Sequence, residues 1–257
     1  MAWATANDGC DIYYEDKGNG PVLVFISGYM GIANIWHQQI KAFSPKYRCL
    51  SFDRRGYGRS AKPEAIEEHS IDKQVGDIKT ILHVANVTGP VILSTHSMGC
   101  NIASAFYLAY PELVAGIICS ASHYDGELAG SLGLNVDGLV EPVRNLPTRP
   151  GFFEKLGLTP DIALEAAKWP IYGLEGSAHV AANFVIAGQY AKFDIPVLLV
   201  HGDSDIVTPA DPAVVKFDEA LPKSRLVYLK GVNHFPQIEA PGEYNDIVQE
   251  FLTKYYA

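Results

Sequence analysis

The chain has 257 residues, of which 48% are hydrophobic and 19% charged, a balance typical of one large soluble globular domain. A net charge of −9 argues against nucleic-acid and anionic-membrane partners, because either would require a clustered basic face. No apolar run approaches the roughly 20 residues that span a bilayer. The N-terminal segment also lacks the basic and apolar regions of a signal peptide, so we expect a cytoplasmic protein that contacts no membrane.

Short apolar runs alternate with amphipathic stretches along the chain. Continuous apolar runs are typical of parallel strands that helices cover on both faces. In chain order we expect strands at 11–16 and 22–27, a helix at 32–43, a strand at 48–53, a helix at 71–87 capped by Ser70, a strand at 91–96, a helix at 98–110 ended by Pro111, strands at 116–121, 197–202 and 225–230, and a closing helix at 244–255. This order predicts an α/β fold with a doubly wound, mostly parallel sheet.

The alternation stops between residues 123 and 192, where short helical patches lie among glycine, proline and aromatic residues. A stretch of about 70 residues is too long for a plain loop. We therefore expect a core domain formed by residues 1–122 and 193–257, with residues 123–192 inserted as a helical lid.

The four cysteines, Cys10, Cys49, Cys100 and Cys119, form no C-x-x-C pair, and the eight histidines show no metal-ligand spacing. Cys49 and Cys119 lie in apolar runs, where we expect buried free thiols that behave as small hydrophobic side chains. A reduced compartment and a site without metal or cofactor follow as expectations.

Polar residues follow three of the expected strands. Ser97 lies on the turn between a strand and a helix, Asp205 follows the strand ending at residue 202, and His234 follows the last strand. All three are therefore expected at the carboxyl ends of the strands, where ligands bind in open α/β sheets. Taken singly, Ser97 could be a helix cap, Asp205 a turn residue and His234 a surface histidine. Together and in this order they predict a nucleophile, an orienting acid and a base.

The sequence is similar to the α/β-hydrolase superfamily over nearly its whole length. The matching segments are an oxyanion loop at 26–29 (ISGY), a D-x-R-G-x-G-x-S loop at 53–60 (DRRGYGRS), a nucleophile elbow at 95–99 (THSMG), and acid and base segments at 201–209 and 231–234. The resemblance implies that the backbone N–H groups of Tyr29 and Met98 form the oxyanion hole. It also implies acyl transfer from Ser97 to water without a cofactor.

Some positions depart from the family pattern or leave a choice. Thr95 stands where the elbow usually has glycine, and Ser27 where histidine often precedes the glycine of the oxyanion loop. Asp203 is the second candidate for the acid. His96 adjoins Ser97, but neighbouring strand residues point to opposite faces, so we expect His96 behind the sheet and not as the base.

The arginines of the 53–60 loop could form an anion site, although this loop is mostly structural in the family. For substrate binding we expect Gly28, His123, Tyr124, Trp169 and Tyr172, because aromatic residues in a lid favour an apolar, uncharged small molecule.

The predicted function is hydrolysis of an ester or lactone. The open alternatives are a ligand receptor that keeps the triad, a non-hydrolytic biosynthetic enzyme, a carbon–carbon bond hydrolase and a cofactor-free haloperoxidase. Epoxide hydrolases of this fold use an aspartate nucleophile, so serine at 97 argues against that activity. A homodimer is possible.

Overall fold

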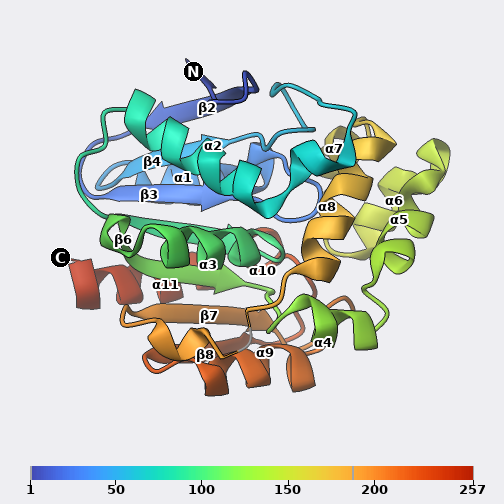
Figure 1. The fold of residues 1–257 in the computed structure, drawn as a ribbon. Helices are drawn as coiled ribbons and strands as arrows, with labels where there is room; N and C mark the ends of the chain where they lie inside the picture. Colours follow the sequence, from blue (N-terminus) through green and yellow to red (C-terminus); the bar gives the residue numbers. More distant parts are fainter. Residues whose placement is uncertain (1, 187, 257) are drawn as a thin grey trace.

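A computed structural model describes residues 2–186 and 188–256. Within these ranges the strands form one eight-stranded sheet in the order β1-β2-β4-β3-β5-β6-β7-β8 (Figure 1). β1 and β2 pair antiparallel to their neighbours, and the pairs from β4 to β8 are parallel. The predicted α/β class and mostly parallel sheet are therefore confirmed.

The strands lie close to the predicted ranges, and β1 is one that the sequence did not indicate. Their bounds are β1 (Ala2–Thr5), β2 (Asp11–Lys17), β3 (Val22–Ile26), β4 (Arg48–Phe52), β5 (Val91–His96), β6 (Val114–Ser120), β7 (Val197–Gly202) and β8 (Ser224–Leu229).

The helices fall into two groups, one packed on the sheet and one in the segment between β6 and β7. The first group is α1 (His37–Phe43), α2 (Ile71–Val84), α3 (Gly99–Ala109), α9 (Ala210–Ala220), α10 (Pro236–Glu239) and α11 (Pro241–Tyr256). The second is α4 (Gly126–Ser131), α5 (Val136–Arg144), α6 (Arg149–Lys155), α7 (Pro160–Ala166) and α8 (Ile171–Asn183). Short 3-10 turns are η1 (Ala33–Trp36), η2 (Ile66–His69), η3 (Pro111–Leu113), η4 (Leu146–Thr148) and η5 (Tyr190–Lys192). Ser70 is the N-cap residue of α2, as predicted, although its side chain makes no capping hydrogen bond.

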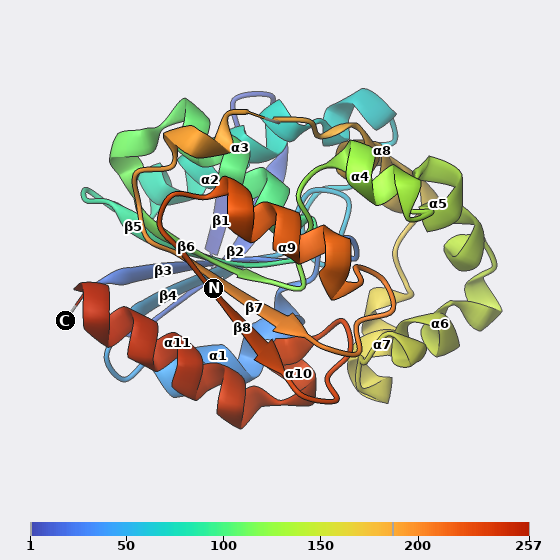
Figure 2. The ribbon, with the colours of Figure 1, turned by 90° about the horizontal axis from the view of Figure 1, so that it is seen from below.

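Each face of the sheet is covered by its own layer of helices. α2, α3 and α9 lie on one side and α1 and α11 on the other, as the view in Figure 2 shows. The central strands alternate accordingly: Val24 and Ile26 belong to the first core, and Leu23 and Phe25 to the second. Helices α4–α8 lie beyond the carboxyl ends of the strands (Figures 1 and 2). This edge of the sheet is where the predicted site residues emerge.

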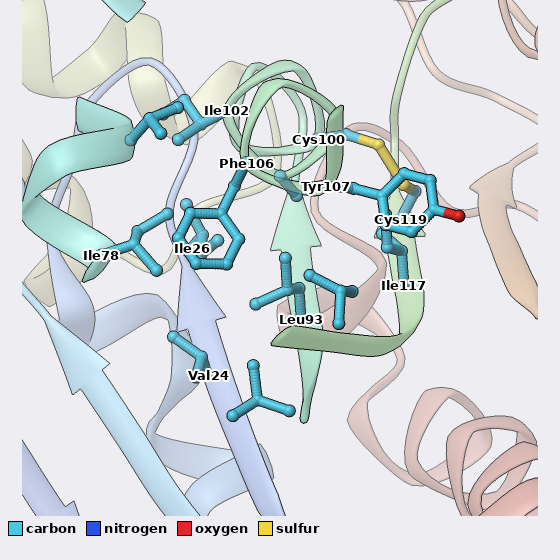
Figure 3. Packing of buried hydrophobic residues seen from close by; sticks show 14 of the residues in the cluster. Val24, Ile26, Ile78, Leu93, Cys100, Ile102, Phe106, Tyr107, Ile117 and Cys119 are labelled. Atoms are coloured by element: carbon cyan, nitrogen blue, oxygen red, sulfur yellow. A yellow bond between two sulfur atoms is a disulfide. The ribbon is translucent and has the colours of Figure 1, made fainter. Parts of the chain in front are cut away.

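The first core shows how α3 is fixed on the sheet. Phe106 of α3 packs among Val24, Ile26 and Leu93 of the strands (Figure 3). At the start of the same helix, Cys100 is bonded to Cys119 of β6, with the two Cα atoms 5.7 Å apart. The prediction of a free thiol at Cys119 is therefore wrong.

Cys49 is a buried free thiol, as predicted.

Within the described ranges no helix has both the length and the apolar character needed to cross a membrane.

Candidate active site

The turn between β5 and α3 places Ser97 in a conformation that exposes its side chain to the edge of the sheet. Ser97 has φ +51°, in the left-handed region that few non-glycine residues adopt. Its backbone N–H donates to Ser120 O of β6 (2.8 Å), which anchors the turn. Gly99 allows the close approach, because a Cβ there would lie 2.5 Å from Ile26 O. The turn therefore has the geometry of a nucleophile elbow.

Thr95 fits into this elbow because its hydroxyl has a backbone partner. Thr95 Oγ1 donates to Ile118 O (3.0 Å) on the adjacent strand β6, and the residue is fully buried. Ser27, the other departure from the family pattern, donates from Oγ to Ile32 O (2.6 Å). Both hydroxyls are used within the scaffold, so neither is available to the reaction.

Ser97, His234 and Asp205 form one continuous hydrogen-bonded chain. His234 Nε2 lies 3.2 Å from Ser97 Oγ, and His234 Nδ1 lies 2.9 Å from Asp205 Oδ2. All three side chains are buried. A carboxylate at Nδ1 fixes the tautomer that leaves Nε2 unprotonated, so His234 is oriented to accept the Ser97 proton.

The Asp205 carboxylate is held by several donors. Oδ1 accepts from the backbone N–H groups of Val207 (2.8 Å) and Thr208 (2.9 Å), and Oδ2 accepts from Thr208 Oγ1 (2.8 Å) as well as His234. Burial alone would raise the pKa of Asp205, but His234 and these hydrogen bonds hold it well below its ordinary value. Asp203 instead accepts from Gly231 N (2.7 Å) at the surface, so the geometry favours Asp205.

The residues predicted to supply the oxyanion donors line the same cavity as Ser97. Met98 begins the turn into α3 directly after Ser97, and Tyr29 lies in the loop after β3. Within residues 2–186 and 188–256, neither backbone N–H donates to a protein acceptor. Gly28 brings the two segments together, because a Cβ there would lie 3.0 Å from Ser97 Cβ. Two free N–H groups beside the nucleophile can stabilise an oxyanion.

Two further buried histidines, His96 and His123, lie on the Ser97 side of the triad. His96 was predicted to lie behind the sheet, but it lines the cavity at Ser97, donates from Nε2 to His234 O (2.8 Å) and stacks on Phe235. The chain leaves the strand at this point, so strict alternation no longer applies. Burial lowers the pKa of His96 to about 3 and that of His123 to about 4, and both are neutral near pH 7. His96 is therefore a neighbour that supports the His234 backbone, not a second base.

A cavity of about 280 Å³ opens above Ser97, between the sheet edge and helices α4–α6 and α8. Its lining is almost wholly apolar and includes Leu139, Phe152 and Phe153. The described residues that line it carry no Lys, Arg, Asp or Glu side chain. The site can therefore enclose a small uncharged group next to the nucleophile.

The five predicted substrate contacts divide in two. His123 lines the cavity, and Gly28 touches the nucleophile turn. Tyr124, Trp169 and Tyr172 lie outside the lining, so their prediction as substrate contacts is not met. The first two are used elsewhere: Tyr124 packs on Tyr190, and Trp169 lies under Lys62.

The arginines of the 53–60 loop are engaged with protein groups. Arg55 forms a buried bidentate pair with Asp77 (Nε–Oδ2 2.7 Å, Nη2–Oδ1 2.6 Å), and Arg59 Nε pairs with Asp53 (2.7 Å). The loop therefore forms no anion site with these two side chains. No group of three or more His, Cys, Asp or Glu side chains that could hold a metal occurs in the described part of the chain.

Comparison with known proteins gives consistent matches. The model of the alpha/beta hydrolase fold family matches residues 21–160. The chain is 25% identical to epoxide hydrolase 1 of Caenorhabditis elegans, over 95% of this chain and 68% of that protein. It is also 25% identical to the bifunctional esterase/perhydrolase DCH of Acinetobacter calcoaceticus, over 93% and 95% of the two chains. The structure of a bromoperoxidase from Bacillus anthracis superimposes with a TM-score of 0.88, at 24% identity, over 98% of this chain and 99% of that chain.

Proposed function

The chain belongs to the alpha/beta hydrolase family, and from this premise we propose that it is a serine hydrolase that cleaves an ester or lactone bond of a small, largely apolar substrate. The observation that carries the proposal is the hydrogen-bonded chain from Ser97 through His234 to Asp205. The relative named as an esterase/perhydrolase supports the ester specificity.

The proposed reaction proceeds through an acyl-enzyme. His234 Nε2 takes the Ser97 proton as Oγ attacks the carbonyl carbon, and the negative charge forms on the carbonyl oxygen between the Tyr29 and Met98 N–H groups. Each such donor contributes about 2.7–4 kcal/mol to lowering the barrier. His234 then donates its proton to the leaving oxygen. Water attacks the acyl-enzyme in turn, with His234 as base, and Ser97 is released.

The cavity suggests the class of substrate. Its volume of about 280 Å³ lies just below the range of about 300–1,000 Å³ for sites of drug-sized ligands. Because charged side chains are absent from its described lining, a substrate carboxylate or ammonium placed there would be desolvated without a partner. We therefore propose an uncharged acyl group in the cavity and propose that residues 123–192 act as its lid.

Epoxide opening is disfavoured by the nucleophile. Serine attack on an epoxide carbon would form an ether, which water does not readily hydrolyse, whereas attack on an acyl carbon forms an ester that water cleaves. Carbon–carbon bond hydrolysis, haloperoxidase chemistry and receptor function would use the same three residues, so substrate turnover must discriminate among them.

An activity-based fluorophosphonate probe tests the proposal first. Wild-type protein should be labelled, Ser97→Ala should not, and Ser104→Ala, which removes a buried serine of α3 outside the triad, should be labelled like the wild type. Turnover is then compared on p-nitrophenyl esters of increasing acyl length and on γ- and δ-lactones. Absence of labelling in the wild type would refute the serine-hydrolase proposal. Labelling without multiple turnover of any ester or lactone would favour a receptor.

A further inference from the structure

We infer that Arg54 is a positioning residue of the oxyanion hole: its guanidinium holds the peptide between Gly28 and Tyr29 so that the Tyr29 N–H faces Ser97, and it places a positive charge behind that N–H. The inference rests on the proposed serine-hydrolase function. It assigns a role to an arginine of the 53–60 loop that the triad does not explain.

Arg54 reaches the oxyanion loop from the interior of the protein. Its side chain is 1% exposed. Nη2 donates to Gly28 O (2.5 Å) and lies 3.4 Å from Tyr29 O, and Nη1 donates to the side-chain carbonyl of Gln74. Nη2 also lies 3.3 Å from Ser177 Oγ of α8. The guanidinium therefore binds the oxyanion loop directly.

The Gly28–Tyr29 peptide transmits this contact to the cavity. In a trans peptide the carbonyl oxygen and the amide hydrogen project from opposite edges of one rigid plane. Arg54 and the Gly31 N–H (2.9 Å) both donate to Gly28 O. Fixing the oxygen on the interior side fixes the Tyr29 N–H on the side of Ser97, and two donors on the oxygen polarise that N–H further.

Arg54 differs from its neighbours because it has no carboxylate partner. In the described part of the chain Arg55 and Arg59 form ion pairs with Asp77 and Asp53, and Arg54 forms none. Its guanidinium instead contacts the two backbone carbonyls, the Gln74 amide and the Ser177 hydroxyl described above. The ring of Tyr57 lies 5.2 Å from the guanidinium carbon. Burial lowers the pKa of Arg54. Burying a cation without a carboxylate partner lowers the stability of a fold, which suggests that Arg54 has a functional partner.

The developing oxyanion supplies such a partner during the reaction. The ground-state carbonyl is neutral and gains little from a nearby cation, whereas the tetrahedral intermediate carries a full negative charge in a buried site. A group that acts in this way stabilises the transition state more than it stabilises the bound substrate. Loss of Arg54 should therefore lower kcat and leave KM nearly constant.

The test compares Arg54→Met, Arg54→Lys and Arg54→Gln with Arg59→Met, a control on the same loop whose ion pairs are partly exposed. Active sites are counted by end-point fluorophosphonate titration, so that kcat refers to folded enzyme. For Arg54→Met we expect a loss of about 10- to 100-fold in kcat with KM within about threefold, part of a full oxyanion donor's effect. Arg54→Lys should retain more activity than Arg54→Gln, because lysine keeps the charge.

A boronic acid that forms a tetrahedral serine adduct provides a second readout. Its affinity should fall in parallel with kcat across the three variants, while the affinity for the neutral alcohol product stays constant. Unchanged kcat per titrated site in Arg54→Met, or equal activity of the Lys and Gln variants, would overturn the inference. If Arg54→Met does not fold, the comparison of Arg54→Lys with Arg54→Gln decides it. A wild-type protein that turns over neither esters nor lactones would instead refute the proposed function.

Discussion

Replacing Asp205 with asparagine reverses the hydrogen-bond polarity of the triad without changing its shape. Two backbone N–H groups, of Val207 and Thr208, donate to Oδ1. The amide oxygen of an asparagine must take this position, because an NH2 group there would face two donors. The amide nitrogen therefore faces His234 Nδ1 and donates to it, which places the imidazole proton on Nε2, directed at Ser97. In that tautomer His234 cannot accept the serine proton.

The size of the effect follows from the contacts that are lost. The substitution removes the charge-assisted hydrogen bond between His234 Nδ1 and the Asp205 carboxylate, worth about 1.5–3 kcal/mol. In the productive tautomer it also leaves two buried donors, His234 Nδ1–H and the asparagine NH2, facing each other, at about 1–3 kcal/mol. A total of about 4 kcal/mol corresponds to roughly a 10³-fold loss in kcat. Initial rates with p-nitrophenyl butyrate, normalised by circular dichroism for the folded fraction, measure this loss.

Asp203→Asn is the matched control, because Asp203 lies two residues away and accepts from Gly231 N at the surface. We expect its kcat to stay within about threefold of the wild type, as for a residue outside the proton path. If Asp205→Asn kept a tenth or more of the wild-type kcat while Asp203→Asn lost activity, Asp203 would be the acid and the tautomer reasoning would be wrong.

Three other expectations follow from packing and charge. Gly28→Ala should lower kcat at least tenfold, because its Cβ would lie 3.0 Å from Ser97 Cβ. A Gly28→Ala variant that hydrolyses esters at the wild-type rate would contradict this expectation. Asp77→Asn removes the buried carboxylate of a bidentate pair, leaving Arg55 only the less buried carboxylates of Asp8 and Glu68, and should lower the free energy of unfolding in urea by about 3 kcal/mol. By contrast, Asp16→Asn in a partly exposed pair should lower it by less than 1 kcal/mol. The pKa of His123 is lowered to about 4 from 6.5. Between pH 4 and 6.5 the unfolded chain binds a proton on His123 and the folded chain does not, so the free energy of unfolding should fall as the pH drops from 6.5 to 4.5. The wild type should lose about 2 kcal/mol more than His123→Asn over this range. Equal losses in the two proteins would show that His123 is protonated in the fold.

The elements that the sequence could predict are those set by local pattern. Continuous apolar runs identified the parallel strands, and the polar residues directly after them had to meet at one edge of the sheet. That rule alone brings Ser97, Asp205 and His234 together. β1 was not predicted because a four-residue edge strand has no period to detect, and α9 was not predicted because Pro212 lies in its first turn, directly after the non-helical Asp211.

The remaining errors concern contacts between segments distant in sequence. Whether Tyr124, Trp169 or Tyr172 faces the substrate depends on how the helices between β6 and β7 pack, which no single helix encodes. The pairing of Cys100 with Cys119 likewise depends on the seating of α3 against β6. Composition indicates that such residues are at least partly buried. Composition does not indicate which residues they contact.

A different difficulty applies to the oxyanion hole, because its donors are backbone N–H groups that every residue except proline carries. Side-chain identity at Tyr29 and Met98 is therefore not what the sequence must specify there. It must specify the surroundings that hold the two groups in place: a glycine at 28 for close approach and, by our inference, a buried arginine at 54 that grips the carbonyl side of the same peptide. Motif comparison locates the donors, but only the contacts behind them explain why their loop keeps its shape.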